Sequence, residues 1–272
     1  MDEALLLLFT AYLDAGDELL FADPTFVMYP MLGEGIGAKV VRVRSGENLA
    51  LPVSDLLAQI SPRTRVIAIA NPNNPTGLAV SRADVLKIVE AAPDAAVLID
   101  EAYFEFCGET LIPDLARHPN LFVARTFSKA YGLAGLRLGV LTGPAEQIDY
   151  LRRFSLPFNV NSVVLACLEE ALADQEFVRE HVAQVKQGRE QLAQLFTELG
   201  LRFWPSQTNF VLVRIGASAR TFMESMRQRG ILVRDSSANP GCEGCVRITV
   251  GTPPQMEEVL KSIREAIGEI SG

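Results

Sequence analysis

Short apolar runs that alternate with amphipathic segments constrain this chain more than any other feature of its sequence. In the first half such runs occupy residues 18–22, 38–43, 65–70, 95–100, 121–124 and 138–141. Segments with helical spacing separate most of them, at residues 2–13, 54–60 and 81–92 among others. Strands that are short and nearly continuously apolar are typical of a parallel sheet buried on both faces. The sequence therefore predicts an α/β fold with a mostly parallel sheet and helices on both faces.

The second half of the chain has a different pattern. From residue 144 helical composition dominates, with a long charged amphipathic stretch at 162–199 that Gly200 ends. Strands are then expected at 201–204, 210–214, 231–234 and 246–250, and helices at 219–229 and 255–267. A chain of 272 residues, 49% of them hydrophobic, is long enough for two modest domains. We expect a large domain over residues 1–152 and a smaller C-terminal α+β domain over 153–272.

Charge and apolar content argue against two classes of partner. The chain has 25 Lys and Arg against 33 Asp and Glu, so its formal charge of −8 offers no basic excess to nucleic acid. The apolar segment at 4–13 is too short to span a bilayer, and the acidic start is unlike a signal peptide. We therefore expect a cytoplasmic protein with neither nucleic acid nor membrane as a partner.

The four cysteines do not form a recognisable framework. Cys242 and Cys245 are separated by two residues, but no second pair or nearby histidine completes a zinc site. We expect no metal site, and the sequence alone favours neither a metal nor a redox role for this pair.

A polar loop after the run at 121–124 carries distinctive chemistry. Thr126 and Ser128 supply hydroxyls, Lys129 supplies an amine, and Arg137 follows eight residues later. A lysine amine can form a Schiff base with an aldehyde, while hydroxyls and a guanidinium can hold a phosphate. The loop suits a phosphorylated aldehyde, although a lone Ser-Lys pair is more often a surface turn.

Three other apolar strands also end in polar or turn-forming residues, at 23–26, 71–77 and 100–103. Taken separately, Asp100 could cap a helix and 71–77 could be a tight turn. Ligands of open parallel sheets bind beyond the carboxyl ends of the strands, where these segments are expected to meet. Together they predict a binding site at this edge of the sheet.

These motifs resemble those of fold-type-I, pyridoxal-phosphate-dependent aminotransferases of classes I and II. The matching segments are Asn-Pro-Asn-Asn-Pro-Thr-Gly at 71–77, Asp-Glu-Ala-Tyr at 100–103, Ser-Lys at 128–129 with Arg137, and Arg-Ile-Thr-Val-Gly at 247–251. The resemblance covers the chain from Asp2 onward and is greatest to histidinol-phosphate aminotransferases. It implies pyridoxal 5′-phosphate as the cofactor, an amino donor and a 2-oxo acid as substrates, and a homodimer.

The resemblance also implies a role for each matching residue. Lys129 is expected to bind the cofactor covalently and to move a proton at the substrate Cα, and Asp100 to keep the pyridine nitrogen protonated. Tyr103 and Asn74 would bond the phenolic oxygen of the ring, and Phe26 would stack on the ring, where most members carry another aromatic residue.

The remaining matches concern anions. The resemblance implies that Thr126, Ser128 and Arg137 hold the cofactor phosphate. It also implies that Arg247 binds the α-carboxylate of the substrate, for which a planar guanidinium is well suited. Arg234 would face the substrate phosphate. Asn209 and, more loosely, Asn159 would line the site.

One departure from the family concerns the start of the chain. Family members carry an N-terminal arm and a Gly-Ser or Gly-Thr turn whose amides cradle the cofactor phosphate near residue 2. Met1 stands where the hydroxyl residue of that turn would be. We expect a truncated chain or a misplaced start, with the phosphate site reduced to its Thr126, Ser128 and Arg137 side and part of the dimer interface lost.

The expected reaction converts L-histidinol phosphate and 2-oxoglutarate to imidazole-acetol phosphate and glutamate in histidine biosynthesis. A threonine-phosphate decarboxylase or another aminotransferase of classes I and II is the alternative, because one sequence does not show which bond at Cα breaks. An alternative of another class is a non-catalytic fragment.

Overall fold

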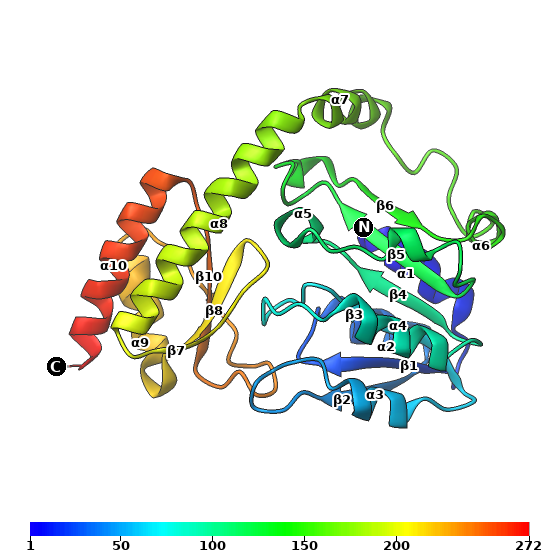
Figure 1. Cartoon of the computed structure of the whole chain (residues 1–272), viewed down its shortest axis with the longest axis horizontal. Helices are drawn as coiled ribbons and strands as arrows, with labels where there is room; N and C mark the ends of the chain where they lie inside the picture. The colour runs from blue at the N-terminus through cyan, green and yellow to red at the C-terminus, as the bar shows by residue number, and fades with distance from the viewer. Residues whose placement is uncertain (272) are drawn as a thin grey trace.

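The computed structural model describes residues 1–271, which contain two sheets (Figure 1). The larger sheet has six strands in the order β2-β1-β3-β4-β5-β6. Five of them are parallel, and β6 runs antiparallel to β5. The strands are β1 (Glu18–Asp23), β2 (Lys39–Arg44), β3 (Thr64–Ala70), β4 (Ala96–Asp100), β5 (Leu121–Thr126) and β6 (Gly139–Thr142). The predicted mostly parallel sheet is confirmed.

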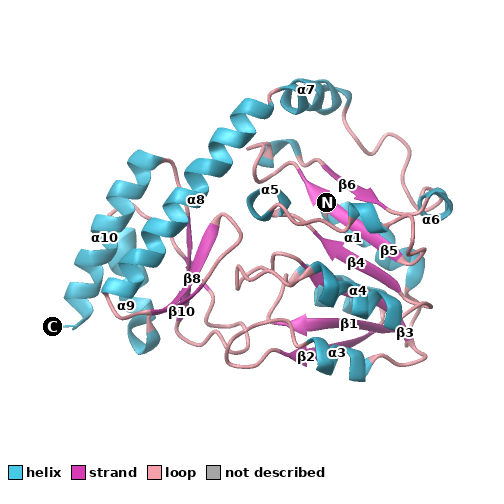
Figure 2. Cartoon of the chain, viewed as in Figure 1, coloured by secondary structure: helices cyan, strands magenta, loops and turns pink. Residues whose placement is uncertain are grey.

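Helices cover both faces of the six-stranded sheet (Figure 2). One face packs against α1 (Asp2–Tyr12), α2 (Met28–Ile36) and α6 (Ala145–Leu151), and the other against α3 (Val53–Gln59) and α4 (Arg82–Ala91). Alternate strand residues face opposite sides, as in β4, where Val97 joins one apolar cluster and Leu98 the other. Burial on both faces explains why the strands are continuously apolar in sequence.

The smaller sheet is antiparallel and has the order β7-β8-β10-β9. Its strands are β7 (Arg202–Trp204), β8 (Phe210–Arg214), β9 (Arg234–Asp235) and β10 (Cys245–Thr249). The helices α8 (Gln175–Glu198), α9 (Ala219–Gln228) and α10 (Pro253–Ser271) share one apolar cluster with this sheet. Tyr103 and Phe106, from the segment that follows β4, join the same cluster, so the two sheets are packed together through it.

Two sequence predictions differ from the structure. The single helical stretch expected at 162–199 is two helices, α7 (Ser162–Ala173) and α8, because Asp174 caps α8 by accepting a hydrogen bond from the N–H of Phe177 at 3.1 Å. The strand expected at 231–234 shrinks to β9, since only Arg234 and Asp235 pair with β10. A short helix not expected from the sequence, α5 (Phe104–Cys107), follows Tyr103. None of the helices described within residues 1–271 combines the length and apolar character needed to cross a membrane.

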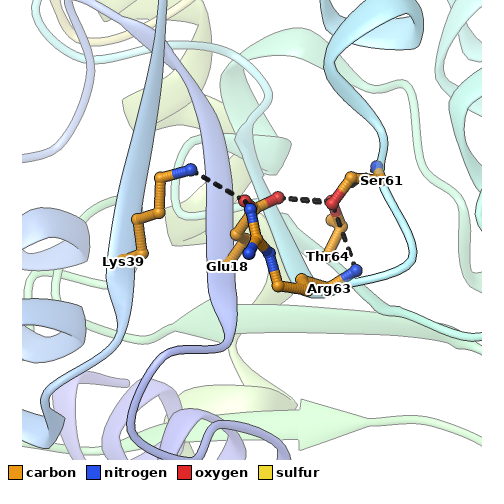
Figure 3. A network of polar contacts seen from close by, with 5 residues as sticks. All are labelled: Glu18, Lys39, Ser61, Arg63 and Thr64. Carbon is orange, nitrogen blue, oxygen red and sulfur yellow. Dashed lines mark hydrogen bonds and ion pairs between the residues drawn. The ribbon is translucent and has the colours of Figure 1, made fainter.

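A polar network holds the edge of the sheet where β1 begins (Figure 3). The buried Glu18 carboxylate accepts hydrogen bonds from Lys39 at 2.9 Å and from Ser61 at 2.6 Å. Arg63 and Thr64 approach it at 3.3 and 3.5 Å. The hydrogen bonds from Ser61 and Lys39 lower the pKa of Glu18. Because Glu18 starts β1, this network ties β1 to the strands on either side of it at the amino end of the sheet.

Candidate active site

A cavity of about 200 Å³ lies at the carboxyl ends of β3, β4 and β5. The last residues of these strands, Ala70, Asp100 and Thr126, line it. All eight residues that the resemblance assigned to the cofactor line this one cavity: Phe26, Asn74, Asp100, Tyr103, Thr126, Ser128, Lys129 and Arg137. The fold therefore gathers side chains that lie up to 111 residues apart in the sequence, from Phe26 to Arg137.

Asp100 is the buried acid of the cavity. Its side chain accepts hydrogen bonds from the Tyr29 hydroxyl at 2.8 Å and from the N–H of Ala102 at 3.0 Å. Burial raises the pKa of the Asp100 carboxyl to about 6, against the effect of these two hydrogen bonds. Among residues 1–271 no cation forms an ion pair with Asp100. A buried carboxylate without a cation is the partner that the protonated pyridine nitrogen of pyridoxal phosphate requires, so the residues present fit this cofactor.

Tyr29 is a site residue that the sequence did not reveal. Its ring is fully buried in α2, and its hydroxyl reaches Asp100 across a separation of 71 residues. Burial and the neighbouring Asp100 charge raise the pKa of Tyr29, so the phenol stays protonated and donates. Tyr29 follows Phe26 by three residues, and the two rings meet edge to face with centres 5.8 Å apart. Phe26 precedes α2, and its carbonyl oxygen accepts a hydrogen bond from the N–H of Tyr29 at 3.1 Å, so one turn places both rings.

Lys129 lies in the loop after β5, half-buried, with Nζ 5.6 Å from the centre of the Tyr103 ring. Burial lowers the pKa of the Lys129 amine, the nearby Arg247 charge adds to this, and Asp100 opposes it. A lower pKa increases the fraction of neutral amine, which is the form that attacks an aldehyde. Burial also raises the pKa of Tyr103 to about 12, so its hydroxyl stays protonated and can donate a hydrogen bond.

The three residues expected to hold the phosphate, Thr126, Ser128 and Arg137, also line the cavity. Thr126 Oγ1 donates to Ser128 Oγ at 2.9 Å and accepts from the N–H of Ser128 at 3.2 Å. Arg137 has a left-handed backbone with φ +55°, and its Nη2 pairs with Asp2 at 2.7 Å. The hydroxyls are thus held together by one another, while the exposed guanidinium of Arg137 is shared with a carboxylate.

Arg247 connects the smaller sheet to the cavity. Its Nη1 donates to Asn74 Oδ1 at 2.6 Å, and its guanidinium carbon lies 4.6 Å from the centre of the Phe210 ring. Burial lowers the pKa of Arg247, and its buried Nε has no hydrogen-bond partner within the described residues. A buried guanidinium with a free donor can bind a carboxylate.

Arg247 is not itself among the residues that line the cavity and reaches it through Asn74, and three other expected residues also lie outside the lining. Arg234 is exposed on β9 and pairs in register with Arg247. Asn209 accepts a backbone hydrogen bond from the N–H of Val250 at 2.9 Å. Asn159 lines a separate groove and donates to Glu3 at 3.0 Å. The structure therefore groups Arg234 with Arg247, and it does not bring Asn209 or Asn159 to the cavity.

A parallel sheet that places a lysine, a buried aspartate and a tyrosine around one cavity defines the class of pyridoxal-phosphate transferases. A family model, aminotransferase class I and II, matches residues 1–263, and the chain belongs to that family. Its cofactor is pyridoxal 5′-phosphate.

The chain is similar to named relatives and to solved structures. The histidinol-phosphate aminotransferase of Dehalococcoides mccartyi is 35% identical over 266 residues, which are 97% of this chain and 74% of that protein. The histidinol-phosphate aminotransferase of Sinorhizobium meliloti in complex with pyridoxal-5′-phosphate has a TM-score of 0.91 at 27% identity, covering 99% of this chain and 75% of that one. The L-threonine-O-3-phosphate decarboxylase of Porphyromonas gingivalis has a TM-score of 0.83 at 25% identity, covering 98% and 81%.

Proposed function

We propose that this aminotransferase takes the amino group from L-histidinol phosphate and passes it to 2-oxoglutarate. The observation that carries the proposal is the pair of arginines on adjacent strands, Arg247 beside the cavity and Arg234 next to it in register. Both substrates carry an anionic group away from the reacting carbon, a phosphate in one and carboxylates in the other. Two neighbouring guanidinium groups can bind these anions in turn. The names of the relatives agree with this choice.

The side chains of the site divide the work of the reaction. Bound pyridoxal phosphate supplies an aldehyde that takes up the amino group and a ring that accepts the electron pair left at Cα. Asp100 would keep a proton on the pyridine nitrogen, and Tyr29 orients that carboxylate by a hydrogen bond. Lys129 would hold the aldehyde at rest and, once released, would take the proton from Cα of the substrate. Arg247 binds the carboxylate of 2-oxoglutarate and keeps the substrate in position.

The remaining side chains of the lining would hold the cofactor. Tyr103 and Asn74 would bond its phenolic oxygen, Phe26 would pack on the ring, and Thr126, Ser128 and Arg137 would hold its phosphate. Asn74 is oriented for this by Arg247, which occupies its carbonyl oxygen and leaves its NH₂ group to donate. Asn209 is proposed to contribute at the substrate end of the site.

The reaction is tested by incubating the purified chain and pyridoxal phosphate with L-histidinol phosphate and 2-oxoglutarate, and measuring glutamate. We expect glutamate in proportion to the histidinol phosphate consumed, and none with Lys129→Ala. Glutamate formation that is unchanged in Lys129→Ala, or formed only from other amino donors, would contradict the proposal.

The second candidate is decarboxylation of threonine phosphate. The similarity to the Porphyromonas gingivalis decarboxylase favours it, since that fold match covers nearly the whole chain. Both candidates need a phosphate site, so Arg234 serves either one. Threonine phosphate as the only substrate separates them: carbon dioxide release supports decarboxylation, and its absence with glutamate formed from histidinol phosphate supports transamination.

We also propose that the chain acts in the cytoplasm as a homodimer and divides near residue 152 into a large and a small domain. Exposed apolar side chains in and next to α7 support an association: Leu156, Phe158 and Val163 are 74%, 99% and 67% exposed. Sedimentation velocity tests the assembly. A dimer that Phe158→Asp converts to monomer is the expected result, and a monomeric parent chain at all concentrations would contradict it.

A further inference from the structure

Cys242 and Cys245 lie at the two ends of a tight turn that leads into β10. The N–H of Cys245 donates to the carbonyl oxygen of Cys242 at 2.9 Å, and Gly244 between them has φ +69°. A Cβ at position 244 would lie 2.6 Å from the Gly216 carbonyl oxygen, so the shape of the turn depends on this glycine. The ends of such a turn lie within about 7 Å of each other at Cα. This is the range in which a disulfide can close without backbone movement.

The two thiols are free, and Cys245 Sγ donates to the carbonyl oxygen of Glu243 at 3.9 Å. The neighbouring Cys242 thiol and the nearby Arg214 guanidinium lower the pKa of the Cys245 thiol, against the effect of burial. The neighbouring Cys245 thiol, together with burial, raises the pKa of Cys242. The thiolate is the nucleophilic form, so the thiol that stands opposite a cation is the better nucleophile, and that thiol is Cys245, which pairs with Arg214.

Arg214 is placed to support a thiolate. It stands directly opposite Cys245 in the pairing of β8 with β10, so the two side chains share one face of the sheet. Its Nη2 donates to the carbonyl oxygen of Gly241 at 2.8 Å, which anchors it to the turn. Its buried Nε has no hydrogen-bond partner among the described residues, so a donor remains for the sulfur. The pair therefore has a fixed counter-cation, which the spacing of two cysteines in sequence does not show.

The turn lies between the two sheets. Both cysteines belong to an apolar cluster with Trp204 and Leu212 of the smaller sheet, and Leu49 and Leu78 from loops of the larger sheet cover it. The Cβ position of Gly241 is 3.0 Å from Leu49 Cδ2, so the cover touches the turn directly. Both cysteines are fully buried in this cluster. Because the thiols are buried, their oxidation requires a local opening of the cluster.

We propose that Cys242 and Cys245 are a redox-active dithiol, which a low-molecular-weight disulfide such as oxidised glutathione converts reversibly to an intramolecular disulfide. The Cys245 thiolate attacks one sulfur of oxidised glutathione, forms a mixed disulfide and releases one glutathione thiolate. Cys242 then loses its proton, attacks the Cys245 sulfur and expels the second glutathione thiolate. The protein loses two electrons and two protons, and oxidised glutathione is reduced to two glutathione molecules. Reduced glutathione reverses both steps.

The test equilibrates the full chain in buffers of increasing oxidised-to-reduced glutathione ratio, alkylates the free thiols and maps the peptides by mass. We expect a peptide pair linked through Cys242 and Cys245, short of two hydrogen atoms, while Cys107 and Cys167 remain alkylated. Trp204 is the only tryptophan and belongs to the same cluster, so its fluorescence should decrease in step with the disulfide. Full alkylation of Cys242 and Cys245 at every ratio would overturn the proposal.

Two matched variants test the separate roles of the cysteines in a Cys107→Ser, Cys167→Ser background. Cys242→Ser should accumulate one glutathione on Cys245, because no second thiol resolves the mixed disulfide. Cys245→Ser should stay unmodified, because the remaining Cys242 thiol is buried, and burial disfavours its thiolate. The opposite pattern would overturn the assignment of nucleophile. Leu49→Ala removes apolar packing from the cluster around the two cysteines. It should raise the rate of oxidation several-fold without changing the product. An unchanged or slower rate would contradict the inference that this packing limits access to the thiols.

Discussion

The Asp100 carboxylate receives hydrogen bonds from Tyr29 and Ala102, and it forms no ion pair within residues 1–271. Burial of a carboxylate outside an ion pair is costly, which is why the pKa of Asp100 rises to about 6. The polar residues of the cavity were predictable, because each ends an apolar strand or a turn motif. Tyr29 was not, because it looks like an ordinary core aromatic in α2 and meets Asp100 only in the folded chain.

Tyr29→Phe is expected to raise the pKa of Asp100, since the phenol stabilises the charged carboxylate. Losing a hydrogen bond to a charged group of about 1.5–3 kcal/mol corresponds to about one to two pKa units. Carbon-13 NMR of the labelled Asp100 side chain in the cofactor-free chain measures the titration midpoint. Tyr12→Phe is the matched control, because the Tyr12 hydroxyl bonds Gln147 and not Asp100. A midpoint in Tyr29→Phe equal to that of the parent would contradict the proposed role.

Asp100 also gives the cofactor-free chain a pH-dependent stability. Its folded pKa of about 6 is above the unfolded value near 3.8, so the folded state holds the extra proton. The stabilisation that this extra proton gives the folded state is therefore fully present below pH 3.8 and is lost as the pH rises through 6. As the pH rises from 3.8 to 6, the free energy of unfolding of Asp100→Asn should increase by about 3 kcal/mol relative to that of the parent. Urea unfolding at several pH values measures this, and a difference between the two proteins that does not change with pH would contradict it.

Some helices and strands can be predicted from the local sequence pattern, and others depend on contacts with distant parts of the chain. The strands β1, β3, β4 and β5 were expected within a residue or two, because both faces of each are buried and only apolar residues fit. The break between α7 and α8 was missed because the apolar period continues through it, and only the capping role of Asp174 marks it. β9 has just two residues and exists because Arg234 and Asp235 pair with β10, which a local pattern cannot show.

Glu18→Gln is expected to destabilise the start of β1. Gln keeps the shape of Glu18 but loses the charge that accepts from Lys39 and Ser61, at a cost of about 1–3 kcal/mol. The folded pKa of Glu18 is lowered, so its contribution is present above the unfolded value of 4.5 and is lost as the pH falls through the folded pKa. Urea unfolding at neutral and acidic pH measures both effects. Glu34→Gln, which removes an exposed pair with Arg42, should change stability little, and an equal loss there would contradict the role of burial.

At the scale of the whole molecule, the two sheets meet around the site. The hydrogen bond from Arg247 to Asn74 joins β10 to the 71–77 loop, and the cluster around Cys242 and Cys245 packs beside it. The sequence predicted that both sheets exist and that Arg247 belongs to the site. It could not predict the exposed position of Arg234, the absence of Asn209 from the cavity lining, or the contact with Asn74, since these follow from how two separately patterned halves pack.

Arg247→Lys tests whether Arg247 of β10 binds the carboxylate of the substrate. A lysine keeps the charge but loses the planar pair of donors, so about 1.5–3 kcal/mol of carboxylate binding should be lost. The KM for 2-oxoglutarate should therefore rise about 10- to 100-fold. Arg234→Lys is the matched variant and should mainly raise the KM for the phosphorylated amino donor. Steady-state kinetics with each substrate varied in turn measures both, and equal effects of the two variants on both substrates would contradict the assignment.

The site at which pyridoxal phosphate attaches tests most directly whether the cavity around Lys129 holds the cofactor. The chain is mixed with the cofactor, reduced with borohydride and digested, and the modified lysine is identified by mass. We expect the phosphopyridoxyl group on Lys129 alone, because the other lysines, Lys39, Lys87, Lys186 and Lys261, are exposed and lie in no cavity with a buried acid. Label distributed over the exposed lysines, or equal labelling in Lys129→Ala, would contradict the central claim that this cavity holds the cofactor.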